Sequence, residues 1–307
     1  MGSPEFAIPT FTALSKNPNY LLVGLYCQPD KKKGRGQKLC ATRCKEFALE
    51  QNIPVFQPHT LKDDAVFENY KSLKPDLTLV VAYGKIIPER FLELPVFSTF
   101  NVHSSLLPEL RGAAPINWAI ARGYQKTGIT IFKIAKKLDS GDIVFQKELQ
   151  IKKNETATEL YERLSRLSRE IICDVLDNIF SKNITFTPQD DSKASTAPII
   201  KKCDGKINFA LSGNEIFNLI RGFSPWPGTY AIMKNKIFKI LSGELLPLTQ
   251  EASLHKTGSL FDLQRGYVRL SDSVLKLTFV QLEGKKPMNW ETFRCGLKRD
   301  DENLILL

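Results

Sequence analysis

The feature that most constrains the fold is an alternation of short apolar segments with segments of helical periodicity in the first part of the chain. Pro75–Tyr83, which contains LTLVVAY, predicts a buried strand because it is almost uniformly apolar. Further strands are predicted at Leu21–Cys27, Gly128–Ile134 and Ile143–Ile151, and Thr156–Phe180 carries apolar residues at helical spacing. Strands that alternate with helices predict an α/β fold in which a mostly parallel sheet has helices on both faces.

The character of the sequence changes after residue 185. Residues 186–206 are polar and contain two prolines, which predicts a linker. Residues 207–307 consist of short apolar runs with turn residues between them, a pattern typical of a β-barrel. We therefore expect a first domain at residues 1–185, a linker at 186–206 and a smaller C-terminal barrel domain at 207–307. Such a barrel is a common platform for nucleic acids, although it can also be a structural accessory domain.

Composition excludes several classes of protein. The 307 residues contain no apolar run near the roughly 20 residues needed to cross a bilayer, and the N-terminus lacks the pattern of a secretory signal. We therefore expect a cytoplasmic protein with no membrane partner. The six cysteines are scattered and are expected to be reduced thiols. Cys40 and Cys44 have no second Cys or His pair at ligand spacing, so we expect no metal site.

The charge of the chain indicates a polyanionic partner. The formal net charge is +10 and the isoelectric point is about 9.2. The densest basic segment is residues 31–45, which carries seven Lys or Arg and no acid. Gly34 and Gly36 give this segment conformational freedom. It predicts a flexible basic loop that contacts phosphates, and a solvated surface loop is the alternative.

Two polar residues that follow the central apolar runs are candidates for catalysis. The segment NVHSSLLPELRGAAPINW, residues 101–118, begins with Asn101-Val102-His103. In an extended segment, Asn101 and His103 project to the same face. An amide donor beside an imidazole can stabilise a developing oxyanion and move a proton. The alternative is a capped strand with a hydrogen-bonded histidine.

A carboxylate in a later turn is the candidate third member of this site. Asp139 and Asp142 lie in the turn LDSGD, which follows a predicted strand. Loops at the ends of parallel strands gather at one edge of the sheet, where ligands bind. Asp139 there can orient His103. Amide, imidazole and carboxylate would form a site for acyl transfer without a covalent intermediate.

Several segments resemble one enzyme group. NVHSSLLPELRGAAPINWAI is similar to the signature of the formyltetrahydrofolate-dependent formyltransferases, and LDSGDI resembles the group's second catalytic segment. Four further segments resemble the methionyl-tRNA formyltransferases within that group: MGSPEFAIPTF, QPD…GRGQKL, RGFSPWPGTY and LEGKKPM. The resemblance covers nearly the entire chain and implies a Rossmann-like first domain and an OB-like C-terminal barrel. One departure is that Met1 lies directly in the GSPEF-like segment, so we expect the first, central strand of the sheet to be missing.

The resemblance also implies a reaction. The α-amino group of methionine on initiator tRNA attacks the formyl carbon of 10-formyltetrahydrofolate. Asn101 would bind the formyl oxygen, His103 would share in stabilising the intermediate and move protons toward the leaving nitrogen, and Asp139 would hold His103. The resemblance implies no tightly bound cofactor, because the folate is a co-substrate. We expect a monomer.

Binding residues follow from the same resemblance. The folate pocket is expected on Tyr83, Gly84, Ile86, Ser104, Ser105, Leu106, Leu107, Pro108 and Asp142. The tRNA acceptor stem is expected on the basic loop, first through Arg35 and Lys38 and then through Lys31, Lys32, Lys33 and Arg43. Two other functions stay open. A formyltetrahydrofolate-dependent enzyme acting on a small amine should lack the basic loop and the barrel, and a non-catalytic RNA-binding protein leaves the three polar residues unexplained.

Overall fold

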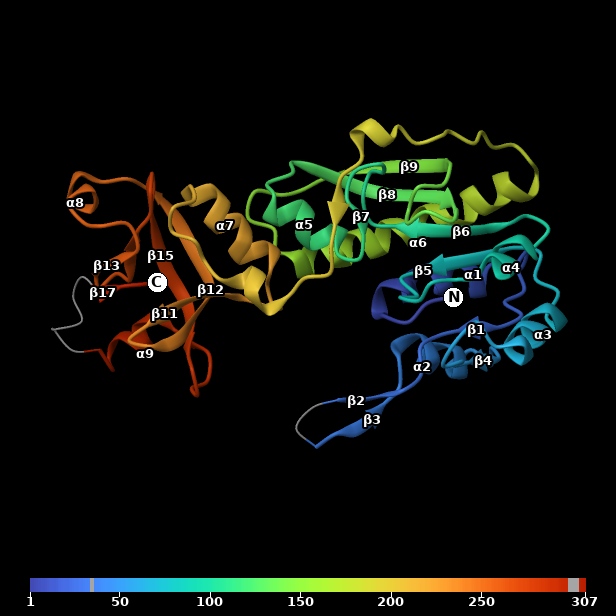
Figure 1. Cartoon of the computed structure of the whole chain (residues 1–307), viewed down its shortest axis with the longest axis horizontal. Coiled ribbons are helices and arrows are strands. Elements are labelled where there is room, and N and C mark those ends of the chain that lie inside the picture. Colours follow the sequence, from blue (N-terminus) through green and yellow to red (C-terminus); the bar gives the residue numbers. More distant parts are fainter. Residues whose placement is uncertain (34–35, 298–303) are drawn as a thin grey trace. The chain divides into compact units, whose positions relative to one another are not determined.

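The computed structural model describes residues 1–33, 36–297 and 304–307, so Arg35 lies outside the described residues. The chain forms two compact units (Figure 1). The first unit contains Met1–Pro115, Thr127–Gln150 and Tyr161–Pro198, and the second unit contains Ile116–Lys126, Ile151–Leu160 and Ile199–Leu307. Among the described residues, no helix is long and apolar enough to span a membrane.

The first unit is built on a four-stranded sheet with the order β5-β6-β8-β9. Its strands are β5 (Thr78–Val81), β6 (Thr99–His103), β8 (Lys126–Lys133) and β9 (Ile143–Gln150). β5 and β6 are parallel, whereas β8 runs antiparallel to β6. Every residue of β5 is buried, which explains why its sequence is continuously apolar rather than alternating. The strands predicted at Pro75–Tyr83, Gly128–Ile134 and Ile143–Ile151 are confirmed as β5, β8 and β9.

A second parallel pair of strands joins this sheet through the first two residues of the chain. The pair consists of β1 (Leu25–Tyr26) and β4 (Val55–Phe56). Gly2 N donates to Tyr26 O at 2.9 Å, the Met1 amine donates to Leu79 O at 2.6 Å, and Val81 N donates to Met1 O at 2.8 Å. Met1 and Gly2 thus lie in a strand position between β1 and β5. A cavity of about 340 Å³ lies beside Met1 and is lined by residues 21–26 and 75–79 among others.

Helices cover the sheet of the first unit. They are η1 (Glu5–Ala7), α1 (Ile8–Lys16), α2 (Arg43–Glu50), α3 (Asp64–Ser72), α4 (Glu89–Glu93) and the C-terminal part of α6 (Ala157–Phe180). α6 confirms the predicted long helix and packs against the η1–α1 segment. Ser165 Oγ donates to Phe6 O at 2.8 Å, and the hydroxyls of Ser168 and Thr10 lie 2.7 Å apart. α2 and α3 each begin at a side chain that accepts a backbone N–H, which satisfies a donor left free by the first turn.

The basic loop forms a hairpin. Its strands are β2 (Lys31–Lys33) and β3 (Lys38–Cys40), which pair antiparallel. Figure 1 shows this hairpin extending away from the rest of the first unit. Lysine is uncommon in strands, so the composition of the segment predicted a loop and not these strands.

Part of the polar segment 186–206 is bound into the first unit. β10 (Thr196–Ala197) pairs in parallel with β7 (Arg111–Gly112), and the short helix η2 (Asp191–Lys193) precedes it. Residues up to Pro198 therefore belong to the first unit, and residues from Ile199 belong to the second. The pairing is only two residues long, too short to produce an apolar period that the sequence could reveal.

The second unit contains an antiparallel sheet with the order β11-β12-β15-β14-β13-β17, and β16 pairs with β15. Its strands are β11 (Thr229–Met233), β12 (Lys236–Pro247), β13 (Ser259–Asp262), β14 (Tyr267–Arg269), β15 (Ser273–Leu282), β16 (Met288–Asn289) and β17 (Leu304–Ile305). Ile232 and Leu307 exchange two backbone hydrogen bonds of 2.6 and 3.1 Å, which bring β11 to the other end of the sheet. The sheet thereby closes nearly into a barrel, as the sequence predicted.

The barrel encloses its own core and carries short helices. The core includes Phe238, Leu275 and Trp290, all at most 2 % exposed. The remaining helices that contribute to the second unit are η3 (Lys202–Gly205), α5 (Pro115–Ala121), α7 (Gly213–Gly222), α8 (Gln250–Ser253) and α9 (Trp290–Arg294). α7 begins with a reciprocal capping box between Ser212 and Glu215, which explains where this helix starts.

Candidate active site

β6 brings Asn101 and His103 to one face at its C-terminal end. Val102 between them is 4 % exposed and points to the opposite face, as the pleat requires. In the sheet register, Asn101 lies opposite Val80 of β5 and His103 opposite Thr130 of β8. Asn101 is half-buried and His103 is 6 % exposed. The pairing on both sides of β6 therefore fixes the backbone that carries the two side chains.

The imidazole of His103 has two different neighbours. Nε2 lies 3.0 Å from Leu110 O, and because a carbonyl only accepts, Nε2 carries a proton and donates. Nδ1 lies 3.8 Å from Oδ2 of Asp139. Phe132 packs edge-on against the ring at a centroid distance of 6.4 Å. Because Nε2 of His103 is engaged in this hydrogen bond, Nδ1, which faces Asp139, is the atom available for proton transfer.

Asp139 is held in a strained turn close to His103. Its backbone φ is +47°, a left-handed conformation that few residues other than glycine adopt. The carboxylate is 12 % exposed, and its Oδ2 accepts a 2.8 Å hydrogen bond from Gly112 N. Two residues further on, a Cβ at Gly141 would lie 1.7 Å from Lys133 O, so only glycine fits there. The structure thus brings His103 and Asp139 within 3.8 Å of each other, and Asn101 lies two residues before His103 on the same face of β6.

The loop after β5 presents the first group of predicted folate-binding residues. Ile86 is 95 % exposed, and Gly84 is exposed with φ +75°. Tyr83, by contrast, is 1 % exposed within the core, and burial raises the pKa of its hydroxyl to about 12. The carbonyl of Tyr83 accepts a 3.0 Å hydrogen bond from Gln28 Nε2. Tyr83 is therefore a packing residue of this loop, whereas Gly84 and Ile86 are exposed members of it.

The segment after His103 alternates between packed and accessible residues. Ser105 and Leu107 are at most 3 % exposed, and Ser105 Oγ donates to Glu109 O at 2.6 Å. Ser104, Leu106 and Pro108 are half-buried, and so is Asp142 of the later turn. The accessible members of the predicted folate set are thus Ser104, Leu106, Pro108 and Asp142, together with Gly84 and Ile86.

The predicted tRNA-binding residues lie on and beside the hairpin. Lys31, Lys32 and Lys38 are exposed on β2 and β3. Arg43 begins α2 and pairs with Glu46 at 2.9 Å and Glu5 at 3.9 Å, so acidic neighbours reduce its local charge. The side chains of Lys33 and Arg35 lie outside what the structure describes.

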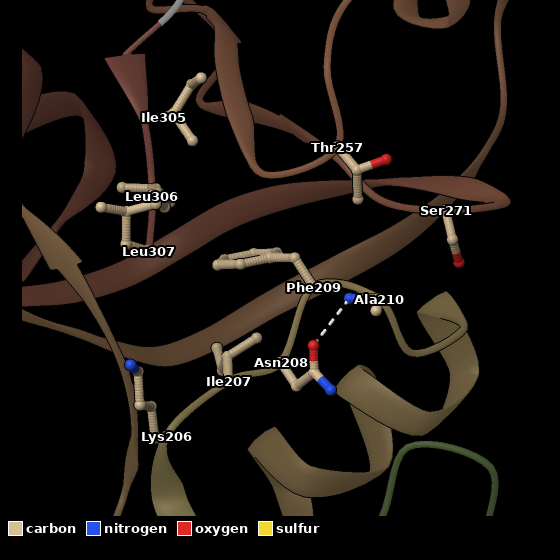
Figure 2. Close-up of a pocket in the computed structure, with 10 residues that line it drawn as sticks. All are labelled: Lys206, Ile207, Asn208, Phe209, Ala210, Thr257, Ser271, Ile305, Leu306 and Leu307. Atoms are coloured by element: carbon tan, nitrogen blue, oxygen red, sulfur yellow. Dashed lines mark hydrogen bonds between the residues drawn. The ribbon is translucent and has the colours of Figure 1, made fainter.

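Two cavities lie apart from these side chains. The 340 Å³ cavity of the first unit lies beside Met1. Figure 2 shows the other, of about 710 Å³, in the second unit, where Phe209, Ile207 and Leu306 give it apolar walls. Across the described part of the chain, no three His, Cys, Asp or Glu residues cluster as metal ligands would. The candidate active site consists of Asn101 and His103 on β6 and Asp139 in the turn between β8 and β9.

Sequence reasoning missed one residue at this site. Gln189, in the polar segment interpreted as a linker, donates to two backbone carbonyls of the Asp139 turn. No motif marks it, because its contacts to this turn are made to backbone atoms of residues about fifty positions away.

Comparison with known proteins identifies the family. A formyl transferase family model matches residues 2–176, and a formyl transferase C-terminal domain model matches residues 199–298. Methionyl-tRNA formyltransferase of Alkaliphilus oremlandii is 41 % identical over 99 % of this chain and 98 % of its own. The enzyme of the same name from Clostridioides difficile is 39 % identical over 94 % of this chain and 93 % of its own.

Solved structures show the same fold at lower identity. The sugar 3N-formyl transferase WlaRD, solved with dTDP and 5-N-formyl-THF, is 20 % identical with a TM-score of 0.64, covering 93 % of this chain and 97 % of its own. An N-formyltransferase from Helicobacter canadensis, solved with folinic acid and dTDP-3-aminofucose, is 20 % identical with a TM-score of 0.67, covering 90 % of this chain and 97 % of its own. With family models on both parts of the chain and curated relatives along nearly all of it, the chain belongs to the methionyl-tRNA formyltransferase family.

Proposed function

We propose that this chain transfers the formyl group of 10-formyltetrahydrofolate to the α-amino group of methionine on initiator tRNA, for translation initiation. The observation that carries the proposal is the 3.8 Å approach of His103 to Asp139, with Asn101 on the same face of β6, in a chain whose relatives are methionyl-tRNA formyltransferases. Two solved neighbours of the same fold contain a formylated folate, which supports a folate donor as co-substrate. A cytoplasmic location and a monomeric state remain predictions.

The reaction makes one C–N bond and breaks another. The amine attacks the formyl carbon, and the formyl oxygen gains negative charge as the tetrahedral intermediate forms. The side-chain amide of Asn101 donates to that oxygen, which lowers the barrier by about 3 kcal/mol if it acts as a typical oxyanion donor. The C–N10 bond then breaks, the amine loses a proton and N10 gains one.

His103 and Asp139 move this proton. With Nε2 donating to Leu110 O, Nδ1 of His103 lies 3.8 Å from the Asp139 carboxylate. The two groups are close enough to share a proton directly after a small movement, or through a water molecule. Burial of both side chains keeps bulk water from competing for it.

The folate donor occupies the accessible residues around this site. Gly84 and Ile86 supply the exposed loop after β5, and Asp142 supplies a carboxylate from the turn on the other side. Ser104, Leu106 and Pro108 shape the entrance, while Tyr83, Ser105 and Leu107 support it through backbone and packing.

Positive charge on both domains binds the tRNA. We assign the two domains to residues 1–185 and 207–307. The β2–β3 hairpin contacts the acceptor stem through Arg35, Lys38, Lys31, Lys32 and Lys33, and Arg43 contributes from the start of α2. The barrel follows the tRNA backbone through lysines such as Lys236, exposed at the start of β12, and Lys239, half-buried within that strand.

An acceptor competition tests the proposal. The enzyme is incubated with 10-formyltetrahydrofolate and methionyl-initiator tRNA, free methionine or an amino sugar, and formylated product is measured. We expect kcat/KM for methionyl-tRNA to exceed that of the small amines by on the order of 100-fold or more, because the tRNA body supplies binding energy. Equal use of a small amine would instead assign the chain to a different acceptor, and no product from any acceptor would indicate a non-catalytic RNA-binding protein.

A further inference from the structure

Gln189 joins two segments of the candidate active site through one side-chain amide. Its Oε1 accepts from Nε and Nη2 of Arg111 at 3.1 and 2.7 Å. Its Nε2 donates to the carbonyls of Asp139 and Gly141 at 2.9 and 2.7 Å. All of the hydrogen-bonding capacity of the Nε2 group is thus directed at the turn that carries Asp139.

Arg111 is itself held in place, so it fixes the position of the Gln189 amide. The side chain of Arg111 is 6 % exposed, and its Nη1 donates to Oδ1 of Asp191 at 2.8 Å. Lys137 donates to the other carboxylate oxygen of Asp191 at 2.8 Å. Lys137 and Arg111 together hold the pKa of the Asp191 carboxyl below its usual range, so the carboxylate stays charged around neutral pH.

Strand β7 supports both the carboxylate and the main chain of Asp139. Gly112, next to Arg111 on β7, donates its N–H to the Asp139 carboxylate at 2.8 Å. Arg111 reaches the Asp139 main chain through Gln189. A residue with φ +47° needs such support, because its backbone would otherwise relax toward a more favourable conformation.

We infer that Gln189 is a positioning residue for the formyl-transfer reaction, because its amide holds the Asp139 turn so that the carboxylate faces His103. The inference rests on the proposed role of Asp139. A displacement of about 1 Å at a reacting group can cost on the order of 100-fold in rate, so a loss of this support has a measurable effect.

Two variants of Gln189 separate its acceptor and donor halves. Gln189→Met keeps the length and removes all four hydrogen bonds. Gln189→Glu keeps the acceptor for Arg111 but cannot donate to the Asp139 and Gly141 carbonyls. We expect kcat to fall on the order of 10- to 100-fold in both variants, while KM for methionyl-tRNA stays within about two-fold. Lys193→Ala, on the same segment with a 75 % exposed side chain paired to Asp190, is the matched control and should keep the normal kcat.

A double-mutant cycle shows whether Gln189 acts through Asp139. Asp139→Asn alone measures the proposed role of that carboxylate, and Gln189→Met is then added to it. We expect Gln189→Met to cause less than about a three-fold further loss in that background, since its partner has already been disabled. Losses that multiply, or a Gln189→Glu variant with normal kcat, would overturn the inference while leaving the proposed function intact. An Asp139→Asn variant with normal kcat would overturn both the inference and the proposed role of Asp139, because the transfer would then proceed without that carboxylate.

Discussion

At the scale of single residues, the site depends on which side-chain atoms already have hydrogen-bond partners and which are accessible. The sequence predicts that Asn101 and His103 share a face, because a strand alternates its side chains. It does not predict that Leu110 O holds Nε2 of His103, since that contact depends on a turn in which Leu110 has φ +59°. Nor does it predict the burial of the Tyr83 ring, because an apolar aromatic residue suits a pocket wall and a core equally well.

At the scale of elements, the longer strands and helices were predictable and the short ones were not. β5 and α6 have strong apolar patterns, and both occur where the sequence predicts them. β7 and β10 are two residues each, and they are held by backbone pairing between Arg111–Gly112 and Thr196–Ala197. No periodicity can reveal such a pair, which is why the polar segment was interpreted as a linker and Gln189 was missed.

The β2–β3 hairpin carries a prediction of its own. Lys32→Ala combined with Lys38→Ala removes two exposed positive charges, so we expect a higher KM for methionyl-tRNA and no change in KM for the folate. The slope of log affinity for tRNA against log salt should fall by about 2. Arg35→Ala is expected to act in the same direction.

Lys71→Ala, on α3 with a 58 % exposed side chain, removes one charge outside the hairpin and should leave the salt slope nearly unchanged. Equal losses for tRNA and folate would mean that the hairpin supports the active site instead.

At the scale of the whole molecule, each unit has a core of its own. The barrel of the second unit is completed by the C-terminal residues, where Leu306 is 2 % exposed and Leu307 pairs with Ile232. All three tryptophans of the chain, Trp118, Trp226 and Trp290, belong to this unit. Tryptophan fluorescence therefore reports on the unfolding of the second unit.

Leu306→Ala is expected to destabilise the barrel. Removing this buried side chain leaves a cavity in the core, which costs about 2 to 5 kcal/mol of unfolding free energy. Leu254→Ala, at an 86 % exposed position of the same unit, should change it by less than about 0.5 kcal/mol. Urea unfolding followed by fluorescence makes the comparison, and similar midpoints for the two variants would show that Leu306 does not contribute to the core in solution.

We expect formyl transfer to methionyl-tRNA to depend on the side chains of Asn101 and His103 on β6 and of Asp139 in the turn between β8 and β9. The most direct measurement is kcat for this transfer in Asn101→Ala and Asp139→Asn, with circular dichroism to verify folding and Asp76→Asn, an exposed carboxylate of the first unit, as control. We expect both site variants to lose on the order of 100-fold or more and the control to be unaffected. A folded Asn101→Ala or Asp139→Asn enzyme with a near-normal kcat would contradict the account.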